Sequence, residues 1–225
     1  MDTARTKTWQ IRVCTNASCG LRYPFSSASP FGKRCPVCLG RTKTARKISS
    51  WAENTSKESD SESIFHAVLL DNVRSALNVG SIFRTADGFG ISNLFLCGIT
   101  PTPENDSIKK TALGAEKSIN WTYSRNAVKL AKILKKEGFT FWALETIPGA
   151  KSILSAGRQP IRRPQTFKGR VLIVGNEEAG VDPDLLDLCS EVFYLPMKGY
   201  KRSYNVAVSF GIAAGMLTLL VENVS

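Results

Sequence analysis

Histidine is nearly absent from this sequence. His66 is the only histidine among 225 residues, and it falls in an expected strand, where a histidine is more often structural than catalytic. The sequence therefore offers no Ser/His/Asp triad, no Cys/His pair and no histidine-based metal centre. The reactions left open are those that need none of these groups.

A leader peptide and a long apolar run are also lacking. The first ten residues, MDTARTKTWQ, are polar. The longest apolar run, Val206–Val221, is short and is interrupted by Ser209, Gly211, Gly215 and Thr218, which makes a membrane span a poor interpretation. We expect a soluble, cytoplasmic protein without a membrane partner. In that compartment cysteines favour metal binding over disulfides.

Acidic residues are scarce relative to basic ones, most of all near the N-terminus. The formal net charge is +11. Residues 1–60 hold eleven Lys/Arg against four Asp/Glu, whereas the other 165 residues hold nineteen against fifteen. Neutralising phosphates releases counterions, so a nucleic acid is a better interpretation than a merely soluble basic surface.

Three regions follow one another along the chain, without an internal repeat. Residues 8–48 are basic and carry cysteines. Residues 49–63, SSWAENTSKESDSES, have little to bury and are typical of a flexible linker. Residues 64–225 alternate apolar runs with helical patterns, which predicts an α/β domain.

Within this larger domain the apolar patterns predict five strands and four helices. The strands are expected at Phe65–Leu70, Asn93–Cys97, Phe139–Leu144, Val171–Val174 and Val192–Leu195. The helices are expected at Val79–Phe89, Lys109–Ser118, Arg125–Glu137 and Asn205–Glu222. The continuous β-branched run at Val171–Val174 favours a buried, parallel sheet. Small residues along the last helix predict close packing, either within the domain or on a second subunit. Cys97 and Cys189 have apolar surroundings and are interpreted as core residues.

Two cysteine pairs stand in the N-terminal region. Cys14 and Cys19 form a C-x4-C pair, Cys35 and Cys38 form a C-x2-C pair, and fifteen residues separate the two. Two such knuckles can place four thiolates tetrahedrally around zinc, and a short basic segment could hardly fold without such a link. We expect a structural zinc ribbon, with unpaired cysteines or a redox pair as the alternatives. Four thiolates leave no open coordination position, so the metal should not be catalytic.

Cations and aromatic residues accompany the cysteines. The cations are Arg12, Arg22, Lys33, Arg34, Arg41, Lys43, Arg46 and Lys47. Tyr23, Phe25 and Phe31 could stack on RNA bases. Their alternative role is the small core of the ribbon, which we expect for at least one of them.

Three segments of the larger domain combine a strand end with a polar, glycine-containing turn. They are Asn78–Gly90, Val174–Gly180 and Leu195–Ala207. Ligands of open α/β sheets bind outside the carboxyl ends of the strands. Taken singly, each segment has an ordinary alternative: Asn78 as a helix cap beside a surface arginine, an acidic loop with turn glycines, and Ser203 or Asn205 as a helix cap.

In this order and spacing, the three segments resemble the SpoU/TrmH branch of the SPOUT superfamily of RNA methyltransferases. The resemblance covers about residues 64–225. It departs from the family at Tyr204, where leucine is common, and at Asn176, where a small residue is common. It implies a parallel sheet with a deep C-terminal trefoil knot, S-adenosylmethionine bound in a bent form within the knot, and a homodimer with its sites near the interface.

The resemblance also implies roles at the reacting end of the site. Arg84 would activate a ribose 2′-hydroxyl, either by gripping a phosphate and stabilising alkoxide charge or as a transient proton acceptor. Asn78 and Glu177 would orient Arg84. Ser203 and Asn205 would place the ribose and the cofactor.

At the cofactor end, the resemblance implies that Gly175, Leu195 and Tyr204 line the pocket, with Met197 nearby. Leu195 and Tyr204 would act mainly through backbone groups that hydrogen-bond the adenine. The expected activity is methyl transfer to tRNA or rRNA. A non-catalytic RNA-binding protein derived from this family is the main alternative, and base methylation is a third.

Overall fold

The structure is a computed structural model that describes residues 9–26, 32–48, 66–158, 167–201 and 203–222, with side chains described as far as Leu217 in the last helix. The chain divides into two compact units, Met1–Asp60 and Ser61–Ser225, and each is considered by itself. The expected linker at 49–63 and the aromatic residue Phe31 lie outside the described residues.

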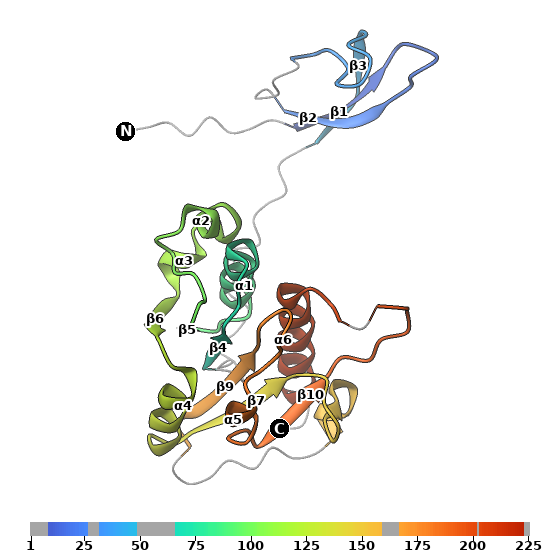
Figure 1. The fold of residues 1–225 in the computed structure, drawn as a ribbon. Coiled ribbons are helices and arrows are strands. Elements are labelled where there is room, and N and C mark those ends of the chain that lie inside the picture. The colour runs from blue at the N-terminus through green and yellow to red at the C-terminus, as the bar shows by residue number, and fades with distance from the viewer. Residues whose placement is uncertain (1–8, 27–31, 49–65, 159–166, 202, 223–225) are drawn as a thin grey trace. The chain divides into compact units, whose positions relative to one another are not determined.

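The first unit is a three-stranded antiparallel sheet in the order β2-β1-β3, formed by β1 (Trp9–Cys14), β2 (Arg22–Ser26) and β3 (Thr42–Ile48) (Figure 1). The loop that carries the second cysteine pair is fastened to one side of this sheet. Thr42 donates a hydrogen bond to the carbonyl of Lys33 (2.6 Å), and Tyr23 donates one to the carbonyl of Arg34 (2.9 Å).

Arg12 and Phe25 form the core of this sheet rather than part of its surface. Both are buried, and the Arg12 guanidinium lies 5.2 Å from the centre of the Phe25 ring. Arg12 also donates to the Thr42 hydroxyl (2.7 Å) and carbonyl (2.8 Å). Phe25 therefore takes the structural role expected for at least one aromatic residue, and Arg12 is wrongly grouped with the surface cations.

The second unit contains a seven-stranded sheet in the order β6-β5-β4-β9-β7-β10-β8, and every neighbouring pair of its strands is parallel. The strands are β4 (Ala67–Asp71), β5 (Asn93–Cys97), β6 (Asn120–Ser124), β7 (Phe139–Leu144), β8 (Lys151–Ser152), β9 (Gly169–Val174) and β10 (Glu191–Tyr194). The helices are α1 (Ala76–Gly88), α2 (Asp106–Ala112), α3 (Ala115–Ser118), α4 (Ala127–Lys136), α5 (Pro183–Leu186) and α6 (Val206–Glu222), with a 3-10 turn, η1 (Ile153–Arg158).

Side chains that alternate along the buried strands build two cores, one on each face of the sheet. In β4, Val68 and Leu70 belong to one core and Ala67 and Leu69 to the other. Helices α1, α2 and α6 cover the first face, and α4 and α5 cover the second. The expected α/β fold with a parallel sheet is confirmed.

Several elements differ from the expectation for local reasons. The expected helix at Lys109–Ser118 is two helices, because Leu113 (φ 52°) and Gly114 (φ 101°) adopt left-handed backbone conformations between them. Strand β6 was missed because it is a partly exposed edge strand with a mixed sequence, NWTYS. Elements β8, η1 and α5 are too short to show a period.

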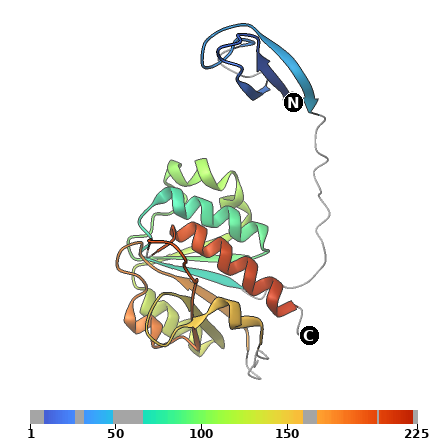
Figure 2. The same ribbon diagram turned by 90° about the vertical axis from the view of Figure 1, so that its right-hand side faces the viewer.

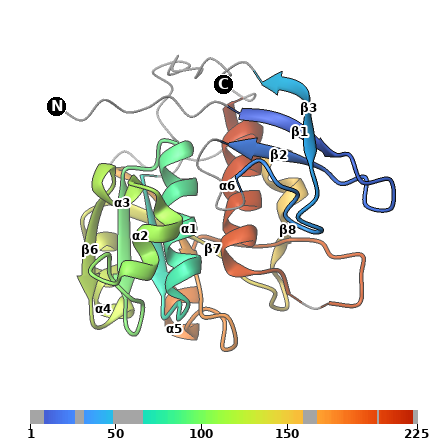
Figure 3. The ribbon, with the colours of Figure 1, turned by 90° about the horizontal axis from the view of Figure 1, so that it is seen from above.

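Late parts of the chain are inserted among earlier ones. Strand β10 pairs with β7 on one side and β8 on the other, although β7 and β8 follow each other in sequence. The chain then leaves the sheet, and α6 packs between α1 and the β8–η1 segment (Figure 3). The trefoil knot implied by the resemblance stays a prediction, because residues 159–166, which would close the loop around this insertion, lie outside the described residues.

Helix α6 uses its small residues for packing within the domain. It runs beside α1 (Figure 2), where a Cβ at Gly211 would lie 3.6 Å from the Thr85 methyl group and one at Gly215 would lie 3.1 Å from Phe89. The small residues were expected to allow close packing either within the domain or on a second subunit. In the structure, Gly211 and Gly215 pack against α1 and Phe89 within the domain. Among the described residues, no helix is both long and apolar enough to cross a membrane.

Candidate functional site

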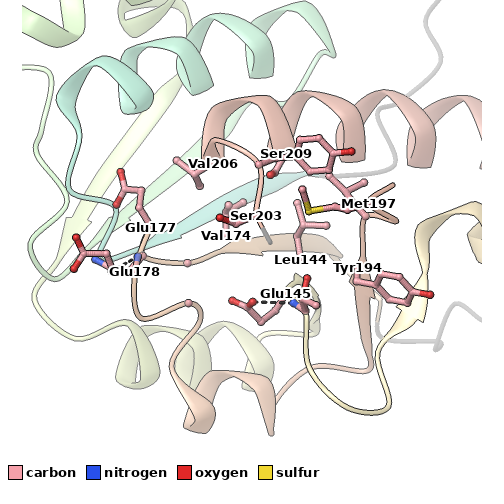
Figure 4. Close-up of a pocket in the computed structure, with 16 residues that line it drawn as sticks. Leu144, Glu145, Val174, Glu177, Glu178, Tyr194, Met197, Ser203, Val206 and Ser209 are labelled. Carbon is pink, nitrogen blue, oxygen red and sulfur yellow. Dashed lines mark hydrogen bonds between the residues drawn. The ribbon is translucent and has the colours of Figure 1, made fainter. Parts of the chain in front are cut away.

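A pocket of about 240 Å³ opens at the carboxyl ends of three neighbouring strands. Leu144 ends β7, Val174 ends β9 and Tyr194 ends β10, and all three line it (Figure 4). We call it the carboxyl-edge pocket. It is also lined by six residues predicted from the sequence: Gly175, Glu177, Leu195, Met197, Ser203 and Tyr204.

Gly175 allows two stretches of backbone to approach each other. A Cβ at this position would collide with the backbone of Gly180 and Val181. The loop doubles back here, and Asn176 and Gly180 exchange two backbone hydrogen bonds of 3.0 Å. The expected reason for this glycine is the close approach of a ligand; in the structure its nearest neighbour is the chain itself.

Asn176, a departure from the family pattern, holds the same loop in place. Its amide group donates to the carbonyl of Asn72 (2.7 Å) and accepts from the backbone N–H groups of Glu178 and Ala179 (2.9 Å each). It is therefore a structural residue of the loop, and it also lines the carboxyl-edge pocket.

Glu177 joins this loop to the start of α1. Its carboxylate accepts hydrogen bonds from the backbone N–H of Arg74 (3.0 Å), the backbone N–H of Ser75 (3.1 Å) and the side chain of Asn78 (3.1 Å). Burial raises the pKa of Glu177, but these donors outweigh it and hold the pKa below its usual value. Glu177 is thus a fixed negative charge at the N-terminus of a helix, where such a charge is stabilised.

Asn78 and Asn205 extend the hydrogen bonding from Glu177 to the third predicted segment, Leu195–Ala207. Asn205 donates to the Asn78 side-chain oxygen (3.0 Å), and its own oxygen accepts from the backbone N–H groups of Ala207 (2.9 Å) and Val208 (3.3 Å) at the start of α6. Asn205 therefore caps α6, which is the ordinary alternative that the sequence allows for it. Asn78 does not cap α1, because Ser75 takes that position and accepts from the Asn78 N–H (3.3 Å).

The chain Glu177–Asn78–Asn205 thus links one residue from each of the three predicted segments. The segments are separated by up to 127 residues in sequence. Because the carboxyl ends of parallel strands meet at one edge of a sheet, the loops that follow β4, β9 and β10 converge there. The predicted residues are brought together by the topology.

Arg84 lies apart from this group. It stands six residues after Asn78 on α1, which places it about 240° around the helix axis. Its exposed side chain lines a separate hollow between α1 and α2, together with Ser81, Thr85, Lys110, Thr111 and Leu113. Within one copy of the chain, the residues that line the carboxyl-edge pocket do not include Arg84.

Glu145 is a pocket residue that the sequence analysis missed. It follows β7 directly, and its carboxylate accepts from the backbone N–H of Thr146 (2.8 Å; Figure 4). It also accepts from the backbone N–H of Val181 (2.9 Å). A carboxylate placed straight after a buried strand was visible in the sequence and could have been found. The pocket therefore contains an oriented negative charge, suited to a cationic or hydroxyl-bearing ligand.

The four N-terminal cysteines come together in the first unit. The sulfur atoms of Cys14 and Cys38 are 3.5 Å apart, those of Cys19 and Cys35 are 3.8 Å apart, and all four ligand atoms lie within 4.8 Å of one another. A tetrahedron with Zn–S bonds of about 2.3 Å has edges of about 3.8 Å, so the spacing fits zinc.

The remaining titratable candidates are structural. His66 accepts from the backbone N–H of Arg170 (3.3 Å), and its ring lies so close to Gly169 that a Cβ there would collide with it. Burial raises the pKa of Cys97 and of Cys189 to about 12. A thiol with so high a pKa is a poor nucleophile, which agrees with the interpretation of both as core residues.

These features define a parallel α/β domain, covered by helices on both faces, with a ligand pocket where three loops meet at the carboxyl edge. Residues 66–215 match the SpoU rRNA Methylase family. The match covers 150 of the 225 residues. The chain belongs to the SpoU rRNA methylase family.

Similar proteins with named activities are RNA 2′-O-methyltransferases. The chain is 33% identical over 145 residues to the 23S rRNA (guanosine(2553)-2′-O)-methyltransferase RlmP of Bacillus subtilis (strain 168), covering 64% of this chain and 54% of that protein. It is 28% identical over 148 residues to the tRNA (guanosine(18)-2′-O)-methyltransferase of Thermus thermophilus, covering 64% and 70%. The chain thus spans about half the length of the first of these relatives.

A solved structure shares the fold and holds a cofactor. The AdoMet-bound rRNA methyltransferase from Sinorhizobium meliloti matches with a TM-score of 0.60 at 25% sequence identity, over 71% of this chain and 56% of that one. The family, the parallel fold and the pocket at its carboxyl edge therefore agree with one another.

Proposed function

We propose that this chain is an S-adenosylmethionine-dependent RNA methyltransferase that acts on a ribose 2′-hydroxyl of tRNA or rRNA. The observation that carries the proposal is the hydrogen-bonded chain Glu177–Asn78–Asn205 beside the carboxyl-edge pocket. It joins one polar residue from each of the three segments at the edge of this pocket. The named activities of the relatives from Bacillus and Thermus support the same reaction.

The residues of the carboxyl-edge pocket fit this cofactor, which supplies a methyl group on a positively charged sulfur. Leu144, Val174 and Leu195 offer apolar walls for a flat ring, and Glu145 offers a carboxylate for a positive charge or a sugar hydroxyl. Gly175, Tyr204 and Met197 would complete the wall. The Tyr204 hydroxyl donates to the carbonyl of Pro196 (3.4 Å), so this departure from leucine fastens the loop and leaves the Tyr204 backbone available.

At the reacting end, a weakly acidic 2′-hydroxyl needs positioning and help with its proton. Ser203 and Asn205 would place the ribose, and Arg84 would grip the neighbouring phosphate and stabilise alkoxide charge, or accept the proton transiently. Glu177 and Asn78 hold Asn205 by the contacts given above. No step in this scheme needs a metal or a histidine.

The position of Arg84 supports a homodimer. One copy of the chain places Arg84 outside its own carboxyl-edge pocket, so a second copy would have to supply it. Apolar side chains are exposed on the two neighbouring helices: Leu77 on α1 (53%), and Val208 (52%) and Ile212 (37%) on α6. We infer that these faces of α1 and α6 meet a second copy and bring its Arg84 to the pocket.

The N-terminal unit would be a zinc-stabilised RNA-binding module. The sulfur spacing of Cys14, Cys19, Cys35 and Cys38 supports a closed, structural zinc site. The exposed cations around it support contact with phosphates. With four thiolates as ligands the ion would fold the module and take no part in the reaction.

The proposed activity is tested by substituting Arg84. Arg84→Ala should lower the rate of methyl transfer from labelled S-adenosylmethionine to total RNA by about 10²- to 10³-fold, because a transition-state contact is lost. Its affinity for the cofactor, measured by calorimetry, should change less than about twofold, because a contact made only in the transition state leaves ground-state binding unchanged. Arg84→Lys keeps the charge, loses the planar fork and should also be severely impaired.

Arg125→Ala, which removes an exposed arginine outside both pockets, is the matched control. The product should resist alkaline cleavage at the modified nucleotide, since that cleavage needs a free 2′-hydroxyl. An alkali-labile methylated product would indicate base methylation instead. RNA binding by the wild type without any methyl incorporation would indicate a non-catalytic RNA-binding protein.

Mixing two inactive variants tests the homodimer. Arg84→Ala keeps an intact pocket, and Gly175→Val, whose larger side chain should abolish cofactor binding, keeps Arg84, so a mixed dimer would contain one complete site if the two come from different copies. Random exchange would then restore about 25% of wild-type activity. Activity that stays at the level of the separate variants, in mixtures proved to exchange subunits, would place Arg84 and the pocket in the same copy.

A further inference from the structure

The sheet of the first unit has one covered face and one open face. The register places Trp9 beside Ser26 and Ile48, Ile11 beside Pro24 and Arg46, and Val13 beside Arg22 and Lys43. Directly paired residues of an antiparallel sheet point to the same side, and neighbours along a strand alternate. One side therefore carries the set that we call the outer face: Trp9, Ile11, Val13, Arg22, Lys43 and Arg46.

The opposite side is the one occupied by the core of the unit. Arg12, Cys14 and Phe25 point there, and all three are buried. The loop with the second cysteine pair is fastened on that side through the Thr42 and Tyr23 hydroxyls. By contrast Trp9 is 45% exposed, and Arg22, Lys43 and Arg46 are exposed.

The outer face has a definite arrangement of chemistry. Its central strand, β1, presents an indole and two aliphatic side chains in a row, Trp9, Ile11 and Val13. The two edge strands present cations: Arg22 on β2, and Lys43 and Arg46 on β3. Neighbouring strands lie about 4.8 Å apart, so Arg22 on one side and Lys43 and Arg46 on the other flank the apolar row, with the two edge strands about 9.6 Å apart.

No carboxylate of the local sequence offsets this positive charge. From Thr3 to Ala52 the sequence contains no aspartate or glutamate. An apolar strip flanked on both sides by cations is complementary to a chain of stacked bases with a phosphate backbone. A neutral or acidic protein partner would leave one of the two chemistries unused.

We propose that the outer face binds an unpaired stretch of the RNA substrate, with a base stacked on Trp9 and phosphates held by Arg22, Lys43 and Arg46. This inference rests on the proposed function, in which RNA is the substrate. Trp9 takes the base-stacking role that the sequence suggests for Tyr23 or Phe25. Phe25 is buried beneath Arg12, and the Tyr23 hydroxyl donates to the carbonyl of Arg34. Duplex RNA hides its base faces in the helix stack and cannot use Trp9 in this way.

Two adjacent cations of β3 provide a matched test. Arg46 pairs with Ile11 on the outer face, whereas Lys47 pairs with Gln10 on the opposite side, and both are exposed. Binding of the full chain to a labelled twelve-residue oligouridylate is measured by fluorescence anisotropy over a range of salt concentrations. Arg46→Ala should weaken binding and lower the slope of log K against log salt by about 0.7, the loss of one phosphate contact on a single strand.

Lys47→Ala removes the same charge one residue away and should leave the slope unchanged. Equal effects of the two substitutions would overturn the assignment to the outer face, because they would show a response to net charge alone. Both side chains are exposed, so neither variant should disturb folding; zinc content of one ion per chain verifies this.

Trp9 tests the stacking component. Trp9→Ala should weaken oligouridylate binding about 5- to 150-fold, the range found for removing a stacking residue, and Trp9→Phe should recover most of that loss. A duplex of the same length should bind the wild type and Trp9→Ala equally. Unchanged oligouridylate binding by zinc-loaded Trp9→Ala would refute the proposal, as would an equal loss for the duplex.

Methyl transfer to total RNA by the wild type is measured in parallel and separates this inference from the proposed function. If the wild type transfers methyl groups but its RNA binding does not depend on Trp9 or Arg46, the assignment of RNA binding to the outer face is refuted and the methyltransferase activity stands. Inactive wild type whose oligouridylate binding depends on Trp9 and Arg46 would refute the methyltransferase activity and leave the RNA-binding face standing.

Discussion

Glu177 should be the residue of the site whose loss costs the larger domain most stability. Its carboxylate accepts three hydrogen bonds, from the N–H groups of Arg74 and Ser75 and from the Asn78 amide. Hydrogen bonds to a partly exposed group contribute about 1 kcal/mol each, so Glu177→Ala should lower the free energy of unfolding by about 3 kcal/mol. In a unit of 165 residues, this corresponds to a fall in Tm of about 6–12 °C.

Its neighbour Glu178 is the matched control. It carries the same charge, but it is exposed and forms a salt bridge to Arg74 (2.7 Å) in which both side chains are more than half exposed. Such a pair contributes about 0–1 kcal/mol. Thermal unfolding of the two alanine variants, followed by circular dichroism, compares them directly. A fall in Tm for Glu177→Ala no larger than that for Glu178→Ala would refute the reasoning.

The pH dependence supplies a second check on the same residue. The folded state holds the pKa of Glu177 below its ordinary value of 4.5. Its contribution to stability is therefore fully present above that value and is lost as the pH falls through the lower, folded pKa. The difference in Tm between wild type and Glu177→Ala should shrink in acid. Glu177→Gln, which cannot ionise, should lie between the two at neutral pH.

Three further predictions concern the metal, the doubled-back loop and the N-terminal unit. Cys35→Ser should lose zinc and unfold the first unit, while the larger domain keeps its Tm. Metal analysis that still finds one ion per chain in this variant would contradict the four-cysteine site. Gly175→Ala should displace the backbone of Gly180 and Val181. S-adenosylmethionine binding, measured by calorimetry, should then weaken by about tenfold or more, which is equivalent to about 1.4 kcal/mol. A normal Kd would show that this loop does not shape the pocket. Deleting residues 1–48 should weaken RNA binding and reduce its salt dependence while sparing cofactor affinity, and an unchanged salt slope would assign the basic unit to another partner.

Much of the larger domain could be predicted because its signals are local. Strands β5 and β7 have the expected bounds, since a continuous apolar run stops where the chain leaves the sheet. Helix α4 shows its buried face as a period in Ala127, Ala131 and Leu134. The elements that were missed, such as β6 and α5, bury too few side chains to show a periodic spacing of apolar residues in the sequence.

From the sequence, the three polar segments and their resemblance to the family predict Asn78, Glu177 and Asn205 as site residues without reference to their contacts. Spacing along the chain could not determine how they meet. Asn205 caps α6 and donates to Asn78 because the order of the strands brings the loops after β4, β9 and β10 to one edge. The alternative role of Asn78 as a helix cap is not taken up, because α1 begins at Ala76 and Ser75 caps it.

Composition and cysteine spacing by themselves determined that the N-terminal unit is basic and suited to zinc, and the three polar segments by themselves determined the family. Tertiary structure decided which side chains of this unit are exposed and able to contact a ligand. Strand pairing turned Arg12 and Phe25 inward and Trp9 and Arg46 outward, because the face of each residue depends on its partner across the sheet and on the irregularity between Ile11 and Arg12. The position of Arg84 away from the pocket of its own chain has a local cause instead, because a helix turns about 100° per residue and the six residues from Asn78 to Arg84 do not return to the same face.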